Sequence, residues 1–172
     1  SRQSKEAPQM IKNIFGKTGE NVWVEAPFHC DYGWNIEVGE NFYSNYNLTI
    51  LDVGKVTCGK NVQIAPNVSI YTAGHPVHPD SRNSGYEYGI PVTVGDNVWI
   101  GGNTVILPGV TVGSNVVIGA GSVVSKDIPD NTIVAGNPCK VIREITDEDR
   151  IYYFKKQKFD DEAWEEVKNK NK

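Results

Sequence analysis

The chain has 172 residues, a formal net charge of -4 at pH 7 and 17 glycines. A chain of this length can form one domain with a sufficient core, because a domain near 150 residues buries roughly 70% of its unfolded surface. The negative charge argues against a general binder of nucleic acid or of anionic membranes, and the sequence has no apolar run of the roughly 20 residues that a membrane span needs. We therefore expect a cytoplasmic protein without nucleic-acid or membrane partners.

Residues 1–16 carry apolar side chains at helical spacing after Pro8, which predicts a short helical cap. The cap would cover the end of the structure formed by residues 17–142. The first part of that structure, from Val22 to Trp34, is irregular and is interpreted as an opening coil.

Apolar residues recur every six positions from Ile36 onward, and the period is clearest over residues 92–128. One column contains Val92, Val98, Thr104, Val110, Val116, Ser122 and Ile128, and a second contains Val94, Ile100, Ile106, Val112, Ile118 and Val124. Glycine often follows the second column and asparagine comes two positions later, and both readily adopt the left-handed backbone of a sharp corner. This period is typical of a parallel β-helix, whose coils stack on one another. An antiparallel sandwich of short strands would need no such phase.

Two segments interrupt the repeat. Two extra residues near 52–55 shift its frame once, and residues 74–91 break it completely. The second segment has 18 residues, a multiple of six, so it is either one further degenerate coil or an external loop. It has almost no aliphatic residues to fill an interior, which favours a loop. Long ordered loops on rigid scaffolds are usually functional.

The chain leaves the coil after Ile128 through two prolines. Thr146 and Asp149 form a capping signal that predicts a helix extending toward Trp164. We expect the aromatic residues of this helical tail, residues 143–172, to pack on the end of the coil or on a neighbouring subunit. The predicted organisation is thus a cap over 1–16, a coil over 17–142 with an external loop at 74–91, and the tail.

His75, at the base of the loop, is the best candidate for chemistry. A neutral imidazole is suited to remove a proton from a hydroxyl near pH 7, and Glu87 on the same loop is a candidate to orient it and to stabilise its protonated form. No nucleophile motif accompanies the histidine. The pattern favours general-base attack by an acceptor without a covalent enzyme intermediate, and the alternative is a structural or solvated loop histidine.

The other histidines and the cysteines suggest no further chemistry. His29, His75 and His78 raise the possibility of a metal held between subunits, as in a carbonic anhydrase of the γ type. Such a site needs histidines on successive coils and none follows His78, so we predict that no metal is required. The three cysteines lack C-x-x-C spacing, and Cys58 occupies an apolar column, which predicts a core residue.

The motifs resemble those of one family, the hexapeptide-repeat sugar O-acetyltransferases of the maltose, galactoside and nodulation group. The resemblance runs from about residue 5 to Arg150 and includes, in order, G-H-P-V-H, N-V-W-I-G-G and I-G-A-G-S-V-V-S-K-D-I-P. The repeat alone is shared with many acyltransferases. The segments N-F-Y-S-N-Y-N-L-T-I and A-G-N-P-C-K-V-I-R make the resemblance more specific.

The resemblance implies an all-β solenoid that is a left-handed parallel β-helix, assembled as a homotrimer with active sites between subunits. It implies acetyl-CoA as donor and a sugar hydroxyl as acceptor, with His75 as the base. Asp31, Tyr43, Asn45 and Asp52 match acceptor-side positions. From the residues alone, Asn45 could instead be a corner residue in the left-handed conformation.

On the donor side, the positions that match the family's pantetheine and nucleotide groove are Trp99, Gly101, Gly102, Ala120, Ser125, Lys126 and Arg143. Small residues let an extended pantetheine arm lie against backbone donors, while Lys126, Arg143 and Lys140 offer positive charge to the CoA phosphates. The backbone N–H of Gly102 is a candidate oxyanion donor. Trp99 could equally be an exposed aromatic residue on a corner.

The chain departs from the family at its N-terminus. Family members begin with a longer helical segment that closes the acceptor site and carries an acidic residue there, so the acceptor is the part of the function that the resemblance determines least. Two alternatives stay open. One is acetylation of a non-sugar hydroxyl, on an antibiotic or an amino acid, and the other is a non-catalytic trimeric scaffold.

Overall fold

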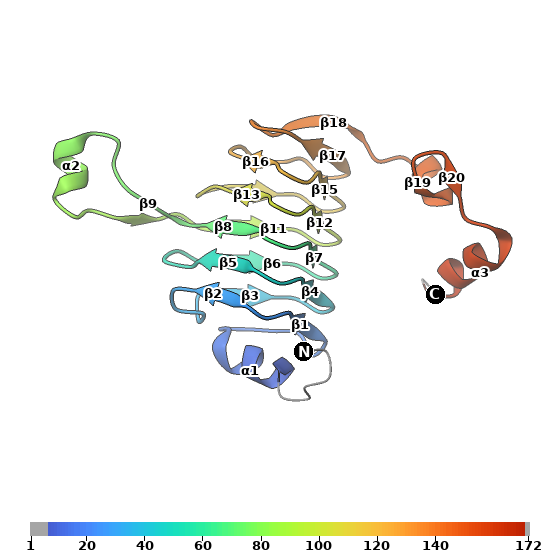
Figure 1. The fold of residues 1–172 in the computed structure, drawn as a ribbon, viewed down its shortest axis with the longest axis horizontal. Coiled ribbons are helices and arrows are strands. Elements are labelled where there is room, and N and C mark those ends of the chain that lie inside the picture. Colours follow the sequence, from blue (N-terminus) through green and yellow to red (C-terminus); the bar gives the residue numbers. More distant parts are fainter. Residues whose placement is uncertain (1–6, 171–172) are drawn as a thin grey trace.

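A computed structural model describes residues 7–170 and shows a parallel β-helix (Figure 1). Short strands stack coil on coil into three faces. Face I contains β3 (Ile36–Val38), β6 (Val56–Cys58), β11 (Val92–Val94) and β14 (Thr111–Val112). Face II contains β1 (Val22–Val24), β4 (Phe42–Ser44), β7 (Gln63–Ile64), β12 (Trp99–Ile100), β15 (Val117–Ile118), β17 (Thr132–Ala135) and the antiparallel β18 (Lys140–Glu144). Face III contains β2 (Phe28–Cys30), β5 (Leu48–Leu51), β8 (Ser69–Tyr71), β13 (Val105–Ile106) and β16 (Val123–Val124).

The two predicted apolar columns form the core of the coil, and every member is buried, including the polar Thr104 and Ser122. Ser122 keeps its hydroxyl satisfied by donating to the carbonyl of Gly119. The last member differs from the prediction in one respect. Ile128 bridges to Val112 of the second column, so the final corner is shorter than a six-residue period requires.

Asparagines form one edge of the solenoid, between faces I and II. Its members are Asn21, Asn41, Asn61, Asn97, Asn115 and Asn131, and each side-chain amide donates to the next side-chain oxygen at 2.7–3.0 Å. From Asn41 onward these residues have φ of 55–59°. Asparagine therefore makes the left-handed corners. The preceding glycines serve another purpose, because a Cβ at Gly95 or Gly113 would lie within 2.6 Å of the next coil.

The segment 74–91 lies outside the coil, because Val92 pairs directly with Val56 of the coil before it. Its stem is the antiparallel pair β9 (Ala73–Gly74) and β10 (Tyr88–Gly89), and its tip carries the short helix α2 (Pro79–Asn83). The loop projects from one side of the solenoid in Figure 1.

The helix α1 (Ala7–Ile14) caps the first coil with the buried side chain of Ile11, and Phe15 just beyond it is buried too. Residues 1–6 of the predicted cap lie outside the described residues. No helix in the described part of the chain is long and apolar enough to cross a membrane.

The tail contains helical segments, but the prediction of one helix from Thr146 toward Trp164 is wrong. A 3-10 helix η1 (Asp147–Ile151) is followed by the hairpin β19 (Tyr152–Phe154) and β20 (Gln157–Lys158), and then by α3 (Asp161–Lys170). Thr146 and Asp149 do form the capping box. The helix stops there because three consecutive aromatic residues favour a strand, and Lys155 turns the chain with φ of 50°. Figure 1 shows the tail standing off the solenoid on the side away from the loop.

Candidate active site

His75 follows β9 at the base of the loop, and its side chain is exposed. Its Nδ1 lies 3.0 Å from the backbone carbonyl oxygen of Tyr86. A carbonyl can only accept, so Nδ1 must carry the proton in this contact. The neutral ring is then the tautomer whose Nε2 has a free lone pair, which is the state that a general base requires.

Close packing of glycines seats the loop stem against the preceding coil. A Cβ at Gly89 would lie 2.7 Å from the nitrogen of Gly54, and a Cβ at Gly54 would lie 2.9 Å from the carbonyl carbon of Gly89. Gly74 is covered by the Tyr88 ring, which a Cβ would meet at 2.5 Å. Buried Thr72 ties the layers together, since its hydroxyl accepts from the Gly54 N–H at 2.8 Å and donates to the carbonyl of Leu51. The base therefore stands on a rigid support.

The sequence predicts that Glu87 orients the imidazole, but the group that holds Nδ1 is the carbonyl of the preceding residue, Tyr86. The charge of Glu87 acts on Asp31, whose pKa it helps to raise. Burial is the main cause of that rise, and the negative charge of Asp52 adds more than that of Glu87. Asp31 thus lies within electrostatic range of Glu87 on the His75 loop.

Asp52 is fully buried, and it organises the turn that carries Asp31. Its two carboxylate oxygens accept from the backbone N–H groups of Asp31, Tyr32 and Gly33 at 3.0, 2.9 and 2.7 Å. Both carboxylate oxygens of Asp52 accept hydrogen bonds from the backbone. Asp52 therefore supports the turn on the predicted sugar-binding side and does not present its carboxylate to solvent.

The edge between faces II and III carries mostly small residues. It consists of Asn45, Ala65, Gly101, Gly119 and Ala135, where each backbone N–H from Asn45 to Gly119 donates to the next coil at 2.8–2.9 Å. We call it the small-residue edge. Gly101 is tightly packed, because a Cβ there would lie 2.5 Å from the Ala120 nitrogen. Gly102 and Ala120 come next on neighbouring coils, each one residue beyond this edge.

Asn45 does not adopt the left-handed conformation, which belongs to Asn47 two residues on. Its side-chain oxygen accepts from the Tyr46 N–H at 2.8 Å, which fixes the amide at the start of the small-residue edge. The alternative that Asn45 fills the left-handed position of a corner is therefore wrong. Tyr43 and Trp99 lie on face II in one outward row with Gln63 between them, and Trp99 is 55% exposed from within a strand.

The cationic candidates lie in three places. Lys126, with Ser125, follows β16 on face III. Lys140 pairs with Ala135 at the end of the small-residue edge, and Arg143 pairs with Ile133 in the middle of β18. Arg143 is held by Asp149 through two 2.7 Å hydrogen bonds, which lower the pKa of that carboxyl. Of the three cations, Arg143 is thus already neutralised within the chain.

The structure divides the predicted site residues between two edges. Asp31, Ser125 and Lys126 follow strands of face III, and the loop that carries His75 and Glu87 leaves the coil after β8 of the same face, at what we call the histidine edge. Tyr43, Asn45, Trp99, Gly101, Gly102, Ala120 and Lys140 belong to face II or to the small-residue edge. Two edges of a three-faced solenoid face different directions. A single chain therefore separates the candidate base from the residues predicted to line the acetyl-CoA groove.

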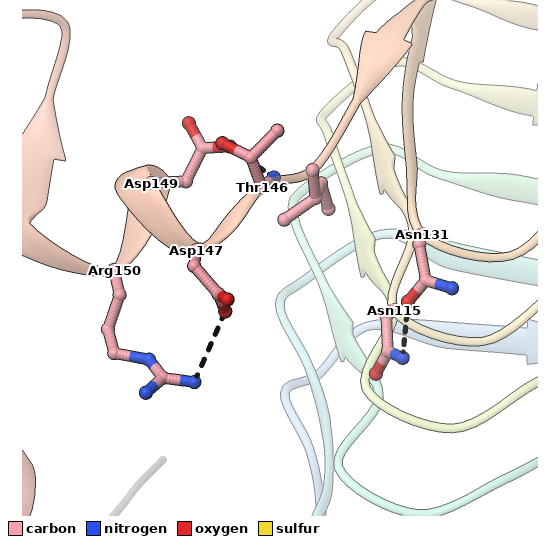
Figure 2. Close-up of a pocket in the computed structure, with 7 residues that line it drawn as sticks. Asn115, Asn131, Thr146, Asp147, Asp149 and Arg150 are labelled. Atoms are coloured by element: carbon pink, nitrogen blue, oxygen red, sulfur yellow. Dashed lines mark hydrogen bonds and ion pairs between the residues drawn. The ribbon is translucent and has the colours of Figure 1, made fainter.

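The cavity in Figure 2 lies away from both groups. Its volume is about 700 Å³, and it separates Asn115 and Asn131 from the start of the tail, where Arg150 contacts Asp147 at 3.7 Å. None of the predicted site residues lines it. The histidines do not gather, and the described residues contain no group of three His, Cys, Asp or Glu side chains that could hold a metal ion.

Sequence reasoning missed the carbonyl of Tyr86 and the Gly54–Gly89 contact. A backbone carbonyl has no signal in the sequence. The two glycines fall outside the six-residue phase, which is the one feature that could have marked them.

Comparison with known proteins agrees with the fold. Residues 91–126 match the bacterial transferase hexapeptide (six repeats) family. The chain is 57% identical over 149 residues to a galactoside O-acetyltransferase of Escherichia coli, covering 87% of the chain and 73% of the relative. A solved galactoside acetyltransferase in complex with coenzyme A superposes with a TM-score of 0.90 at 54% identity, covering 93% of this chain and 81% of that one.

A maltose O-acetyltransferase from Clostridium difficile superposes with a TM-score of 0.83 at 55% identity, over 84% of this chain and 78% of that one. The chain is more than 50% identical to these proteins over most of both sequences. It also has the six-residue repeat, the stacked coils and the external loop that carries His75. The chain therefore belongs to the hexapeptide-repeat acetyltransferases, the family that includes these galactoside and maltose enzymes.

Proposed function

We propose that this protein transfers the acetyl group of acetyl-CoA to a hydroxyl of a sugar of the galactoside or maltose type. The observation that carries the proposal is the His75–Tyr86 contact, which assigns the proton of the neutral ring to Nδ1, so that Nε2 of this ring can accept a proton, on a loop whose stem is closely packed. The similarity to O-acetyltransferases of both sugar types, and to one solved with coenzyme A, gives the donor and acceptor classes.

The reaction proceeds in one ternary complex. His75 Nε2 takes the proton of the sugar hydroxyl as its oxygen attacks the thioester carbonyl carbon. The backbone N–H of Gly102 donates to the oxyanion of the tetrahedral intermediate. When the intermediate collapses, the C–S bond breaks and the imidazolium returns its proton to the departing CoA sulfur, so the enzyme is regenerated without an acetylated residue.

The Tyr86 carbonyl and Glu87 assist the base in different ways. The carbonyl keeps the proton on Nδ1, and the bond between them strengthens when the ring becomes cationic. Glu87, one residue further on, supplies a negative charge that favours the imidazolium without contacting it.

The active site is completed by a second subunit. The base and the carboxylate of Asp31 lie at the histidine edge, while the groove lies at the small-residue edge. A homotrimer that places the histidine edge of one subunit against the small-residue edge of the next would form three equivalent sites, as closed cyclic symmetry allows.

The acetyl-CoA arm fits the small-residue edge. Asn45 stands at its start and Lys140 at its end, with the backbone groups of Gly102 and Ala120 between them. Lys140, and Lys126 from the histidine edge of a neighbour, bind the phosphates as point charges. Arg143 joins them only if the nucleotide displaces Asp149.

The test is acetyl transfer by His75→Ala, measured as thiol release from acetyl-CoA with a galactoside and with maltose. We expect a loss of roughly 10²- to 10⁴-fold in kcat, typical of a lost general base. The matched control is His78→Ala on the same loop, where His78 caps α2 by accepting from the Asp80 N–H. Activity of the His75 variant close to that of the control would refute the role.

A further inference from the structure

Two large aromatic side chains, Tyr32 and Trp34, are exposed side by side next to Asp31. Tyr32 is 47% exposed and Trp34 is 65% exposed, with ring centroids 5.0 Å apart and planes inclined by 37°. We call this pair the aromatic platform. Large apolar side chains gathered on a surface mark a binding site more often than single exposed ones do.

The platform stands on a rigid turn. The buried Asp52 carboxylate accepts from the N–H groups of Tyr32 and Gly33, and the Asn35 side chain donates to the Asp52 carbonyl at 2.7 Å. Gly33 lies against α1, since a Cβ there would meet Ile14 at 2.4 Å. The two rings are therefore presented in a fixed position, which lowers the entropy cost of binding.

The platform is continuous with the acceptor side of the proposed site. Tyr32 directly follows Asp31, and the charge of Glu87 on the His75 loop helps to raise the pKa of the Asp31 carboxyl. The turn belongs to the first coil, whereas the loop leaves the third coil. Neighbouring strands lie about 4.8 Å apart, so the platform is roughly 10 Å along the axis from the base. That is farther than one sugar ring spans.

We infer that the aromatic platform binds a second sugar unit of the acceptor, stacking on the apolar C–H face of its ring while the first unit lies at His75. The inference rests on the proposed function and adds to it a preference for acceptors of at least two sugar units. A sugar ring has one polar rim and one apolar face, so Asp31 and the two rings together match both.

The test compares acceptors of increasing length, namely methyl glucoside, maltose and maltotriose. Trp34→Ala should raise KM for maltose and maltotriose roughly tenfold, the loss expected for one aromatic stack. It should leave kcat/KM for methyl glucoside and KM for acetyl-CoA unchanged, and Trp34→Phe should keep most of the preference. Phe154→Ala, at an aromatic residue of β19 that is 55% exposed, is the matched control.

An unchanged ratio of KM values between short and long acceptors would overturn the inference. So would loss of the oligomer in light scattering without a change in that ratio, since the platform would then be a subunit contact. If the unmodified protein acetylates no sugar at all, the proposed function fails on its own. Calorimetric titration with maltotriose then tests whether the aromatic platform binds sugar. Weaker binding to Trp34→Ala than to the unmodified protein supports the inference, and equal binding to both, or no binding to either, overturns it.

Discussion

The clearest energetic prediction concerns Asp52, whose carboxylate accepts three backbone N–H groups in a fully buried position. Hydrogen bonds to a charged group contribute about 1.5–3 kcal/mol each. Asp52→Ala removes all three, and even at the lower limit the cost is about 4.5 kcal/mol. Domains of this kind have a free energy of unfolding of only about 5–15 kcal/mol. We expect Asp52→Ala to be near the limit of folding and Asp52→Asn, which keeps one acceptor oxygen, to lose about 2 kcal/mol.

Urea unfolding at pH 7 measures these losses, with the slope checked for two-state behaviour. The matched control is Asp96→Ala, which removes a single bond to the Lys60 N–H on an exposed corner and should cost less than about 1 kcal/mol. The same turn carries Asp31, so Asp52→Asn should also raise KM for the sugar but not for acetyl-CoA. A loss for Asp52→Ala no greater than that of the control would refute the reasoning.

Three further predictions rest on particular contacts. Gly89→Ala places a Cβ 2.7 Å from Gly54 and should shift the carbonyl that holds His75, lowering kcat about 10- to 100-fold. Gly85→Ala at the loop tip strains a backbone with φ of 83° but meets no neighbouring atom, so it should destabilise the tip and leave kcat unchanged. Desolvation raises the pKa of Cys58 to about 12, so Ellman's reagent should leave this thiol unreacted in the folded protein and modify it only after unfolding. Glu87→Gln removes one negative charge that raises the pKa of Asp31. The pH below which KM for the sugar rises should therefore be lower in this variant, and a higher pH would contradict the interaction between Glu87 and Asp31.

The coil was predictable because its signal is redundant. Successive coils repeat the same apolar pair, so the phase survives polar members such as Thr104 and Ser122. The external loop was predictable for a related reason, since it lacks the aliphatic side chains that an interior needs. The shortened corner before Ile128 could not be predicted from the sequence, because isoleucine fits either apolar column.

The tail and the details of the site were harder to predict. A capping box such as Thr146–Asp149 marks where a helix starts but not its length, and the ion pair of Asp149 with Arg143 joins residues whose partnership only the folded tail reveals. A carboxylate near a sugar site suggests contact with the acceptor, which is the role that the sequence predicts for Asp52. Burial, which sequence spacing does not report, gives it a supporting role.

The separation of base and groove was also invisible in the sequence, where His75 and Gly102 are simply two motifs in order. The six-residue period gives the coil, but which edge a residue occupies depends on every insertion before it. The edges stay aligned on both sides of the two insertions, which are the two extra residues at 52–55 and the 18-residue loop. They do so because each insertion lies at a single corner.

The central claim is that each active site joins the histidine edge of one subunit to the small-residue edge of another. The most direct measurement mixes two inactive variants, His75→Ala and Ala120→Trp, the latter blocking the groove at an exposed position. After unfolding and refolding together in equal amounts, the mixture as a whole should recover about a quarter of the unmodified activity, because about that fraction of all sites joins two intact edges from different chains. If each site lies within one chain, the mixture will stay as inactive as its two components, and the account will be wrong.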